Sequence, residues 1–435
     1  MYALFTAIPL VGHVNPLLRQ AEALQRRGHQ VAFAGASELR AHVASEAPAV
    51  RFIDLGALGP IARELREAQE RASMDPSFVR GAKRIVDSLW RVWPGMFDGL
   101  RTAMAAEPPD VVVADLFSSA GLSAAEAAGV PCVVNNPDLL GAISPKILPP
   151  ADHLPMLFSG LSPRQLTPWH RLAAPLLRRA AVAYASATVG RRLNALRASR
   201  GLPPVDVHEL LRDRQVLVDG AFGIEYQRPL PSNVAMVGAM LPENTPPLPP
   251  DLAEWLADGT PVVYVNLGTL AVAPDAQLAK MAEAFTAGDR FRTLWILRSD
   301  QASRLPSPRP AALRVLDWGP APAAVLSHPN VKVFVSHCGI NSVYESIHAG
   351  TPIVGIPMFA DQRDMAVRVA DAGIGLWLEK RRFTAAALHA AIVRVHDDAA
   401  FARAIPAAQL ALANAGGVRR AADLIERAAR VRTAA

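Results

Sequence analysis

The sequence has 435 residues, of which 51% are hydrophobic and 19% are charged. A chain of this length and composition can bury a large core and exceeds one ordinary domain, which excludes a mainly disordered protein. The net charge is +6, which suits a polyanionic small ligand better than nucleic acid. Two cysteines, Cys132 and Cys338, are too few for a disulfide framework or a zinc cluster.

The first apolar stretch, residues 1–12, has no basic residue before it and runs into His13. It therefore predicts a buried strand and not a signal peptide. The later apolar stretch 172–189 is interrupted by Arg178 and Arg179. We therefore expect no stable membrane insertion and a cytoplasmic location.

The first half of the chain alternates short apolar runs with helical patterns. Asn15 is expected to cap a helix that begins at Pro16 and ends before Gly28. Buried valine-rich strands separated by helices are typical of a parallel sheet covered on both faces. The predicted strands are 3–9, 30–34, 110–115 and 131–135, and the predicted helices are 16–27 and 118–128.

A proline-rich stretch, 229–250, separates the two halves, because prolines at this density exclude a helix or a central strand. The alternation then restarts, with strands predicted at 262–267, 292–297, 331–336 and 352–356. The sequence thus predicts an α/β protein with two doubly wound domains and a ligand cleft between them. We expect the domains at 1–235 and 236–410, with a C-terminal helix, 411–435, packed across the junction.

The strongest motif runs from Val335 to Glu345, V-S-H-C-G-I-N-S-V-Y-E, between a buried strand and a helix. Gly339 allows a bulky ligand to approach the backbone, and the first turn of such a helix binds phosphate through free N–H groups. The alternative is an ordinary capping box formed by Ser342 and Glu345, which needs no ligand.

The pattern continues on both sides, as W-G-P from Trp318, A-G-T-P from Ala349, I-P from Ile356 and D-Q from Asp361. With these motifs the chain resembles the nucleotide-sugar-dependent glycosyltransferases of family 1, the UDP-glycosyltransferase superfamily. The resemblance implies the GT-B fold, in which two Rossmann-like domains face a central cleft. It places the acceptor in the first domain and the sugar nucleotide in the second.

The resemblance also implies roles for single residues in donor binding. Trp318 would stack on the base, Glu345 would accept hydrogen bonds from the ribose hydroxyls, and Asp361 with Gln362 would bind the sugar. The chain departs from the common pattern at Ala321, where many members carry a glutamine that contacts the base. His337, Asn341 and Ser342 would hold the diphosphate, with Thr269 at its second phosphate. Gly12 and Gly339 are also expected to bind the donor.

A second constellation, G-H-V-N-P from Gly12, matches the turn that carries the family's catalytic histidine. We expect His13 to lie ahead of a helix whose positive end keeps its imidazole neutral and basic. Asp115 ends a strand at the same sheet edge and can orient that imidazole. Asp110, at the other end of that strand, is expected to be structural.

The sequence shows no metal-binding motif and no G-x-G-x-x-G dinucleotide motif, so we expect neither a metal nor a bound cofactor. The prediction is an inverting hexosyltransferase that uses a UDP-sugar, with glucose the expected sugar, and a hydrophobic small-molecule acceptor. We expect a bacterial monomer or weak homodimer whose acceptor contacts loops at about 60–95 and 136–170.

Three alternatives stay open. The donor can be a dTDP-sugar. The chain can be a non-catalytic auxiliary protein of the same fold, although such a protein would be expected to lose His13. Epimerases and phosphorylases share the fold, but a phosphorylase needs a pyridoxal lysine, and none of Lys280, Lys332 and Lys380 lies in a glycine-flanked loop.

Overall fold

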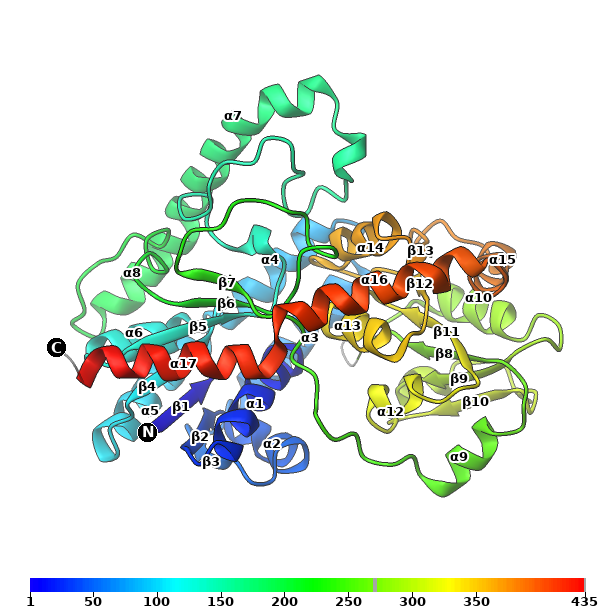
Figure 1. Ribbon diagram of the computed structural model, residues 1–435, viewed down its shortest axis with the longest axis horizontal. Helices are drawn as coiled ribbons and strands as arrows, with labels where there is room; N and C mark the ends of the chain where they lie inside the picture. The colour runs from blue at the N-terminus through cyan, green and yellow to red at the C-terminus, as the bar shows by residue number, and fades with distance from the viewer. Residues whose placement is uncertain (269–271, 434–435) are drawn as a thin grey trace.

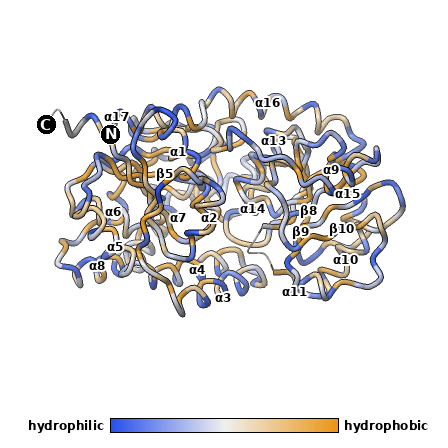
Figure 2. The backbone as a smooth tube through the Cα atoms, turned by 90° about the horizontal axis from the view of Figure 1, so that it is seen from below, coloured by the Kyte–Doolittle hydropathy of each residue, from blue (hydrophilic) through white to orange (hydrophobic). Residues whose placement is uncertain are grey.

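The computed structural model describes residues 1–268 and 272–433, with side chains described up to residue 430. These residues form two α/β lobes side by side, each built on a parallel sheet with helices packed against it (Figure 1). Hydrophobic residues run through the interior of both lobes (Figure 2). The predicted α/β class with two doubly wound sheets is confirmed.

The first sheet is parallel throughout and runs in the order β3-β2-β1-β4-β5-β6-β7. Both of its faces are buried: Leu4 packs into one core cluster, and Phe5 packs into another on the opposite face. The strands are β1 (Tyr2–Thr6), β2 (Gln30–Gly35), β3 (Arg51–Asp54), β4 (Val111–Asp115), β5 (Cys132–Asn136), β6 (Val216–Val218) and β7 (Val234–Met236).

The second sheet is also parallel and runs in the order β10-β9-β8-β11-β12-β13. Its central strand β11 ends at Ser336, directly before the motif that carries His337. The strands are β8 (Val262–Asn266), β9 (Arg292–Ile296), β10 (Leu313–Leu316), β11 (Val331–Ser336), β12 (Ile353–Gly355) and β13 (Gly375–Trp377).

The helices connect the strands and cover both sheets. In the first lobe they are α1 (Val11–Arg26), α2 (Arg40–Glu46), α3 (Pro60–Met74), α4 (Phe78–Leu89), α5 (Trp93–Ala106), α6 (Ser119–Ala127), α7 (Pro168–Ala185) and α8 (Arg191–Ala198). In the second they are α9 (Pro250–Leu256), α10 (Asp275–Phe285), α11 (Ser299–Ala302), α12 (Pro322–Leu326), α13 (Ile340–Ala349), α14 (Gln362–Asp371), α15 (Ala385–Asp397) and α16 (Ala399–Ala415).

The last helix, α17 (Gly417–Thr433), returns from the second lobe to the first (Figure 1). The turn between α16 and α17 is made by Gly416, whose φ of +95° suits glycine. Ala421 and Ile425 of α17 are buried in the core cluster that also contains Leu17 of α1. The C-terminal segment therefore contributes apolar packing to the N-terminal lobe.

The start of α1 corrects the prediction for this turn. The helix begins at Val11 and not at Pro16, and Asn15 lies inside it, where its side-chain oxygen meets His42 Nε2 at 2.6 Å. Pro16 has no N–H to donate to the carbonyl of Gly12, four residues earlier in the helix. That carbonyl accepts a hydrogen bond from Asn341 instead, so the proline is tolerated. His13 is thereby placed in the first turn of the helix.

Residues 60–95, expected as loops, are mostly helical. They form α3, α4 and the start of α5, and the pair α3–α4 packs against the second lobe, where Ala72 and Ile85 share a core cluster with Val265 and Trp295. The amphipathic pattern of this segment supplies an apolar face for each helix, which explains why it folds into helices.

Lys380 fastens the end of α3 to the second lobe. Its buried ammonium donates to the carbonyl oxygens of Ser73 at 2.9 Å, Asp75 at 3.0 Å and Met358. It also lies 5.0 Å from the ring centroid of Phe78. Burial lowers the pKa of Lys380 to about 8, so the group is still charged at neutral pH.

Replacing Lys380 by methionine should therefore destabilise the protein. The change leaves buried carbonyls without their donor, and one such group costs about 1–3 kcal/mol. The free energy of unfolding, measured by urea titration at pH 7, should fall by at least that amount. Lys332→Met, at an exposed lysine of the same lobe, is the control and should change it by less than about 0.5 kcal/mol. Equal effects would contradict the anchoring role.

Candidate active site

A histidine and a carboxylate meet at the carboxyl edge of the first sheet. His13 Nδ1 lies 2.9 Å from Oδ1 of Asp115, the last residue of β4. Asp115 is fully buried, and its other oxygen accepts from the N–H of Phe117 at 3.2 Å. Because Nδ1 is engaged by Asp115, Nε2 is the ring nitrogen left for a ligand. The pairing predicted for His13 and Asp115 is present.

The protonation state of His13 differs from the prediction. Burial lowers its pKa, but the charge and hydrogen bond of Asp115, with smaller contributions from Asp138 and Asp361, outweigh burial and raise the pKa to about 9. Without a ligand the imidazole is therefore a cation at neutral pH. The expectation of a neutral ring is wrong because it gave the helix end more weight than Asp115, whose charge and hydrogen bond raise the pKa of His13 most.

Asp138 is a site residue that the sequence analysis missed. It follows β5, and its carboxyl group is hydrogen-bonded to that of Asp361 from the second lobe. Burial raises the pKa of both groups, so this pair holds a proton between the lobes. The signal was available, because N-N-P-D ends a buried strand beside β4 and so reaches the same sheet edge as Asp115.

In the second lobe, His337 is held between two glycines. A Cβ atom at Gly268 would lie 2.9 Å from His337 Nε2, and one at Gly339 would lie closer still. Burial lowers the pKa of His337 to about 4, so the ring is neutral and carries one N–H donor. Cys338 follows with a φ of +61°, which is uncommon for a side-chain-bearing residue and turns the chain into α13.

The first turn of α13 faces the first lobe and has free N–H donors. Gly339 is the N-cap residue, and the first intrahelical bond runs from the N–H of Val343 to the Gly339 carbonyl at 3.0 Å. The helix therefore does not use the N–H groups of Asn341 and Ser342. No side chain caps this helix, so the alternative of a capping box formed by Ser342 and Glu345 is wrong.

Asn341 links the two lobes at the expected diphosphate position. Its Nδ2 donates to the carbonyl oxygen of Gly12 at 3.0 Å. That carbonyl is available because Pro16, four residues on, has no N–H to give it. The structure thus brings Gly12 and Asn341, both predicted to bind the donor, within hydrogen-bonding distance of one another.

Glu345 lies two residues beyond the free first turn of α13 and is half-buried. In the described part of the chain, no group donates a hydrogen bond to its carboxyl group. Burial raises the pKa of Glu345 to about 7, with Arg19 opposing the shift and Glu46 adding to it. A half-buried carboxyl group without a partner can accept hydrogen bonds from a ligand's hydroxyl groups.

Asp361 and Gln362 stand at the start of α14, as predicted. Asp361 is the N-cap residue, but its side chain does not cap the helix and turns to Asp138 instead. The side-chain oxygen of Gln362 accepts from the N–H groups of Met358 at 2.9 Å and Phe359 at 3.1 Å. Gln362 can therefore offer a ligand only its amide N–H₂ group.

Trp318, predicted to stack on the base, lies at the surface. Trp318 follows β10 with 73% of its surface exposed, so its indole is free to stack on a flat ligand. Thr269 lies outside the described residues.

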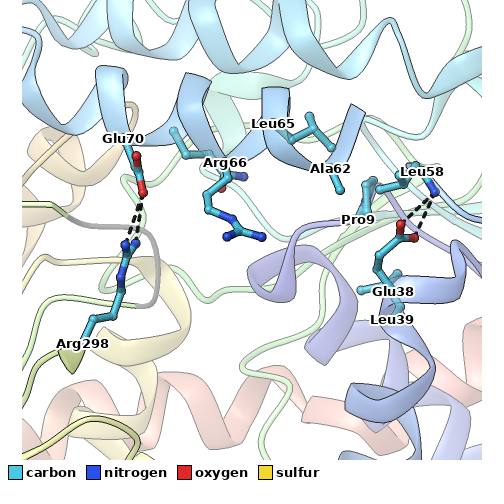
Figure 3. A pocket seen from close by; sticks show the side chains of 10 residues that line it. Pro9, Glu38, Leu39, Leu58, Ala62, Leu65, Arg66, Glu70 and Arg298 are labelled. Atoms are coloured by element: carbon cyan, nitrogen blue, oxygen red, sulfur yellow. Dashed lines mark hydrogen bonds and ion pairs between the residues drawn. The ribbon is translucent and has the colours of Figure 1, made fainter. Parts of the chain in front are cut away.

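A cavity of about 490 Å³ lies between α3 and the loop that follows β1. Apolar side chains of Pro9, Leu39 and Leu65 form part of its wall, and Arg66 points into it (Figure 3). The ion pair of Glu70 and Arg298, at 3.3 Å, closes one end (Figure 3). The expected acceptor contacts at 60–95 thus come from a helix.

Within residues 1–268 and 272–433, no group of three His, Cys, Asp or Glu side chains is placed to hold a metal ion. Over the same ranges, no helix combines the length and the apolar character needed to cross a membrane.

The fold is shared with solved glycosyltransferase structures of the GT-B class. The glycotransferase of kitacinnamycin matches with a TM-score of 0.72 at 22% identity, covering 98% of each chain. VinC, solved in complex with dTDP, matches with 0.70 at 19% identity, covering 99% of this chain and all of that one. TcCGT1, solved in complex with UDP, matches with a TM-score of 0.69 at 20% identity, covering 98% of this chain and 99% of that one.

Sequence comparison assigns the family. The model described as "UDP-glucoronosyl and UDP-glucosyl transferase" matches residues 98–407, and the chain belongs to this family of glycosyltransferases. UDP-glycosyltransferase 1 of Phaeomoniella chlamydospora is 26% identical over 338 residues, which cover 74% of this chain and 68% of that protein. UDP-glycosyltransferase stmC of Aspergillus ustus is 25% identical over an alignment of 459 residues, which covers 94% of this chain and 83% of that protein.

Proposed function

We propose that the protein transfers a sugar from a UDP-sugar to a hydroxyl group of a hydrophobic small molecule, with inversion at the anomeric carbon. The observation that carries this proposal is the pair of His13 and Asp115, next to Gly12, whose carbonyl is bound by Asn341 from the free first turn of α13. The hydrogen bond from Asn341 to Gly12 keeps the two halves of this site together. A base from one lobe and an anion site on the other suit a single displacement.

In this mechanism Nε2 of His13 takes the proton from the acceptor hydroxyl group. The acceptor oxygen forms a bond to the anomeric carbon while the bond from that carbon to the diphosphate oxygen breaks, so that UDP leaves. Asp115 holds Nδ1 and stabilises the imidazolium that forms. The N–H groups at the start of α13 and the neutral His337 stabilise the charge on the departing diphosphate.

The raised pKa of His13 gives this proposal a pH dependence. His13 must lose its proton before it can accept one, so kcat/KM should rise about tenfold per pH unit below about 9 and level off above it. Asp115→Asn should move the plateau to lower pH, because it removes the carboxylate that raises the pKa most. A profile already flat between about pH 6 and about pH 8 would contradict a base with a pKa raised to about 9.

The same shift contributes to stability. The pKa of His13 is higher in the folded protein than its ordinary value of 6.5. Its protonated form therefore stabilises the fold fully below pH 6.5, and this contribution is lost as the pH rises through about 9.

We propose that the donor diphosphate is held without a divalent cation, because the helix N–H groups and His337 supply the positive potential. Turnover should then be unchanged after treatment with excess EDTA and gel filtration. A strict requirement for Mg²⁺ or Mn²⁺, restored by adding the ion back, would contradict this assignment.

The cavity beside α3 is our candidate for the acceptor, because it combines apolar walls with polar side chains and lies next to the loop that precedes His13. Incubation with UDP-glucose and a panel of aromatic and polyketide alcohols, followed by mass spectrometry, tests the proposed function. Products heavier by one hexose are expected. Failure with every acceptor, together with undetectable UDP binding, would favour the auxiliary-protein alternative.

A dTDP-sugar donor is the second candidate. Ala321 removes an amide contact to the base, and VinC, one of the similar structures, is a complex with dTDP. The unpartnered carboxyl group of Glu345 favours UDP, because only ribose offers it two hydroxyl groups.

A further inference from the structure

The helix α7 presents its apolar side chains to solvent. Five of the nine large hydrophobic side chains that are exposed in the described chain lie on this helix. Trp169 and Leu172 are 77% and 71% exposed, and Leu176 is 70% exposed. In Figure 1 the helix stands out from the body of the first lobe. A single exposed leucine needs no explanation, but a concentration on one helix does.

These side chains form one face. Trp169, Leu172, Leu176, Ala180 and Ala183 follow the spacing of three or four residues that places them on the same side of a helix, and all five are exposed. The packed side of the helix is marked instead by the buried Ala174. The amphipathic pattern therefore points away from the protein core, the reverse of an ordinary surface helix.

The segment around α7 is basic over a long stretch. Between residues 153 and 205 the sequence contains eight arginines and neither aspartate nor glutamate. Arg178 is paired with Asp152, and Arg192, Arg197 and Arg200 also have acidic partners. Among the described residues no acidic partner reaches the exposed Arg164, Arg171, Arg179 and Arg191.

Arg171 and Arg179 lie on α7 itself. On a helical projection both lie on the same side of the apolar face, Arg179 about 20° and Arg171 about 100° from its edge. From there their long side chains can reach the same surface as Trp169 and Leu172. A surface that combines an apolar face, a tryptophan and uncompensated arginines is complementary to the interface of an anionic bilayer.

We propose that α7 docks the protein on anionic lipid membranes, with its apolar face in the headgroup region and its arginines on the lipid phosphates. A helix with apolar side chains on one face and arginines beside it lies in the interface and does not span the bilayer. The binding is peripheral and reversible, and it does not depend on the proposed donor or acceptor.

Co-sedimentation of the whole protein with vesicles tests the proposal. Binding is expected to vesicles of phosphatidylcholine and phosphatidylglycerol in equal amounts, and to be at least about tenfold weaker with phosphatidylcholine alone. Added salt should weaken the binding to the anionic vesicles. Absence of binding to the anionic vesicles, or equal binding to both compositions, would overturn the proposal.

Matched variants on α7 and on α16 test whether α7 is the surface that binds the vesicles. Trp169→Ser with Leu172→Ser and Leu176→Ser should lower vesicle affinity at least about tenfold, whereas Leu410→Ser, at a leucine 61% exposed on α16, should not. Arg171→Glu with Arg179→Glu should act similarly, and Arg403→Glu on α16 is its control. Because all these side chains are exposed, thermal unfolding should be unchanged.

Sedimentation velocity without lipid tests whether a second copy of the chain, and not a membrane, covers the apolar face of α7. A monomer is expected across the concentration range of the vesicle assay. A dimer that the triple serine variant abolishes would assign the apolar face to a second copy of the chain and overturn the proposal. Undiminished vesicle binding by both α7 variants would overturn it as well.

Discussion

Replacing His13 by alanine is expected to lower kcat by about 10²–10⁴-fold, the usual contribution of a positioned general base. The structure supports an effect of this size because His13 is held by Asp115 at 2.9 Å and has Nε2 free. UDP affinity, measured by calorimetry, should change little, because the proposed donor contacts lie mainly in the second lobe.

The control for this change is His153→Ala, at an exposed histidine of the same lobe. It should leave turnover and UDP affinity as they are. Asp115→Asn should reduce kcat by less than His13→Ala, because an imidazole without its carboxylate still has some basicity. Near-normal turnover of His13→Ala on an alcohol acceptor would show that another group removes the proton.

The second large effect concerns the nucleotide. If Glu345 accepts from both ribose hydroxyls, a thymidine donor leaves part of a half-buried carboxylate unpaired, because deoxyribose lacks the 2′-hydroxyl. A missing hydrogen bond to a charged group costs roughly 1.5–3 kcal/mol, or about ten- to a hundredfold. Competition of UDP and dTDP against one labelled donor should show UDP binding tighter by that ratio.

The preference should also depend on pH. Since the pKa of Glu345 is raised to about 7, the carboxylate form dominates only above that value, and the preference should be larger at about pH 8 than at about pH 6. Glu345→Ala should abolish most of it by weakening UDP binding, while Glu283→Ala, at an exposed glutamate of the same lobe, should not. Equal inhibition constants for UDP and dTDP in the unchanged enzyme would contradict the ribose contact.

Local sequence signals predicted the parts of the site that depend on neighbouring residues. The valine-rich run ending at Asp115 and the run ending at Ser336 predicted the two strands that carry the site, because fully buried parallel strands need continuous apolar residues. The unbroken spacing from His337 to Gln362 likewise placed the first turns of α13 and α14 at the edge of one sheet.

The features that the sequence did not reveal arise where the two lobes meet. The charge of His13 comes chiefly from Asp115, but Asp138 and Asp361 add to it, and these two residues lie far apart in the chain and are brought together only by the packing of one lobe on the other. The contact of Asn341 with Gly12 depends on a helix that starts earlier than its asparagine and proline suggested. Such long-range electrostatics and cross-lobe contacts have no local pattern.

The most direct test of the account is the anomeric configuration of the product made from UDP-glucose, whose glucose is α-linked to the diphosphate. A single displacement, with His13 taking the acceptor proton, predicts a β-linked product and no α-linked one. Proton NMR of the purified product distinguishes the two through the coupling of its anomeric proton. An α-linked product would contradict inversion by direct attack and with it the role proposed for the His13–Asp115 pair.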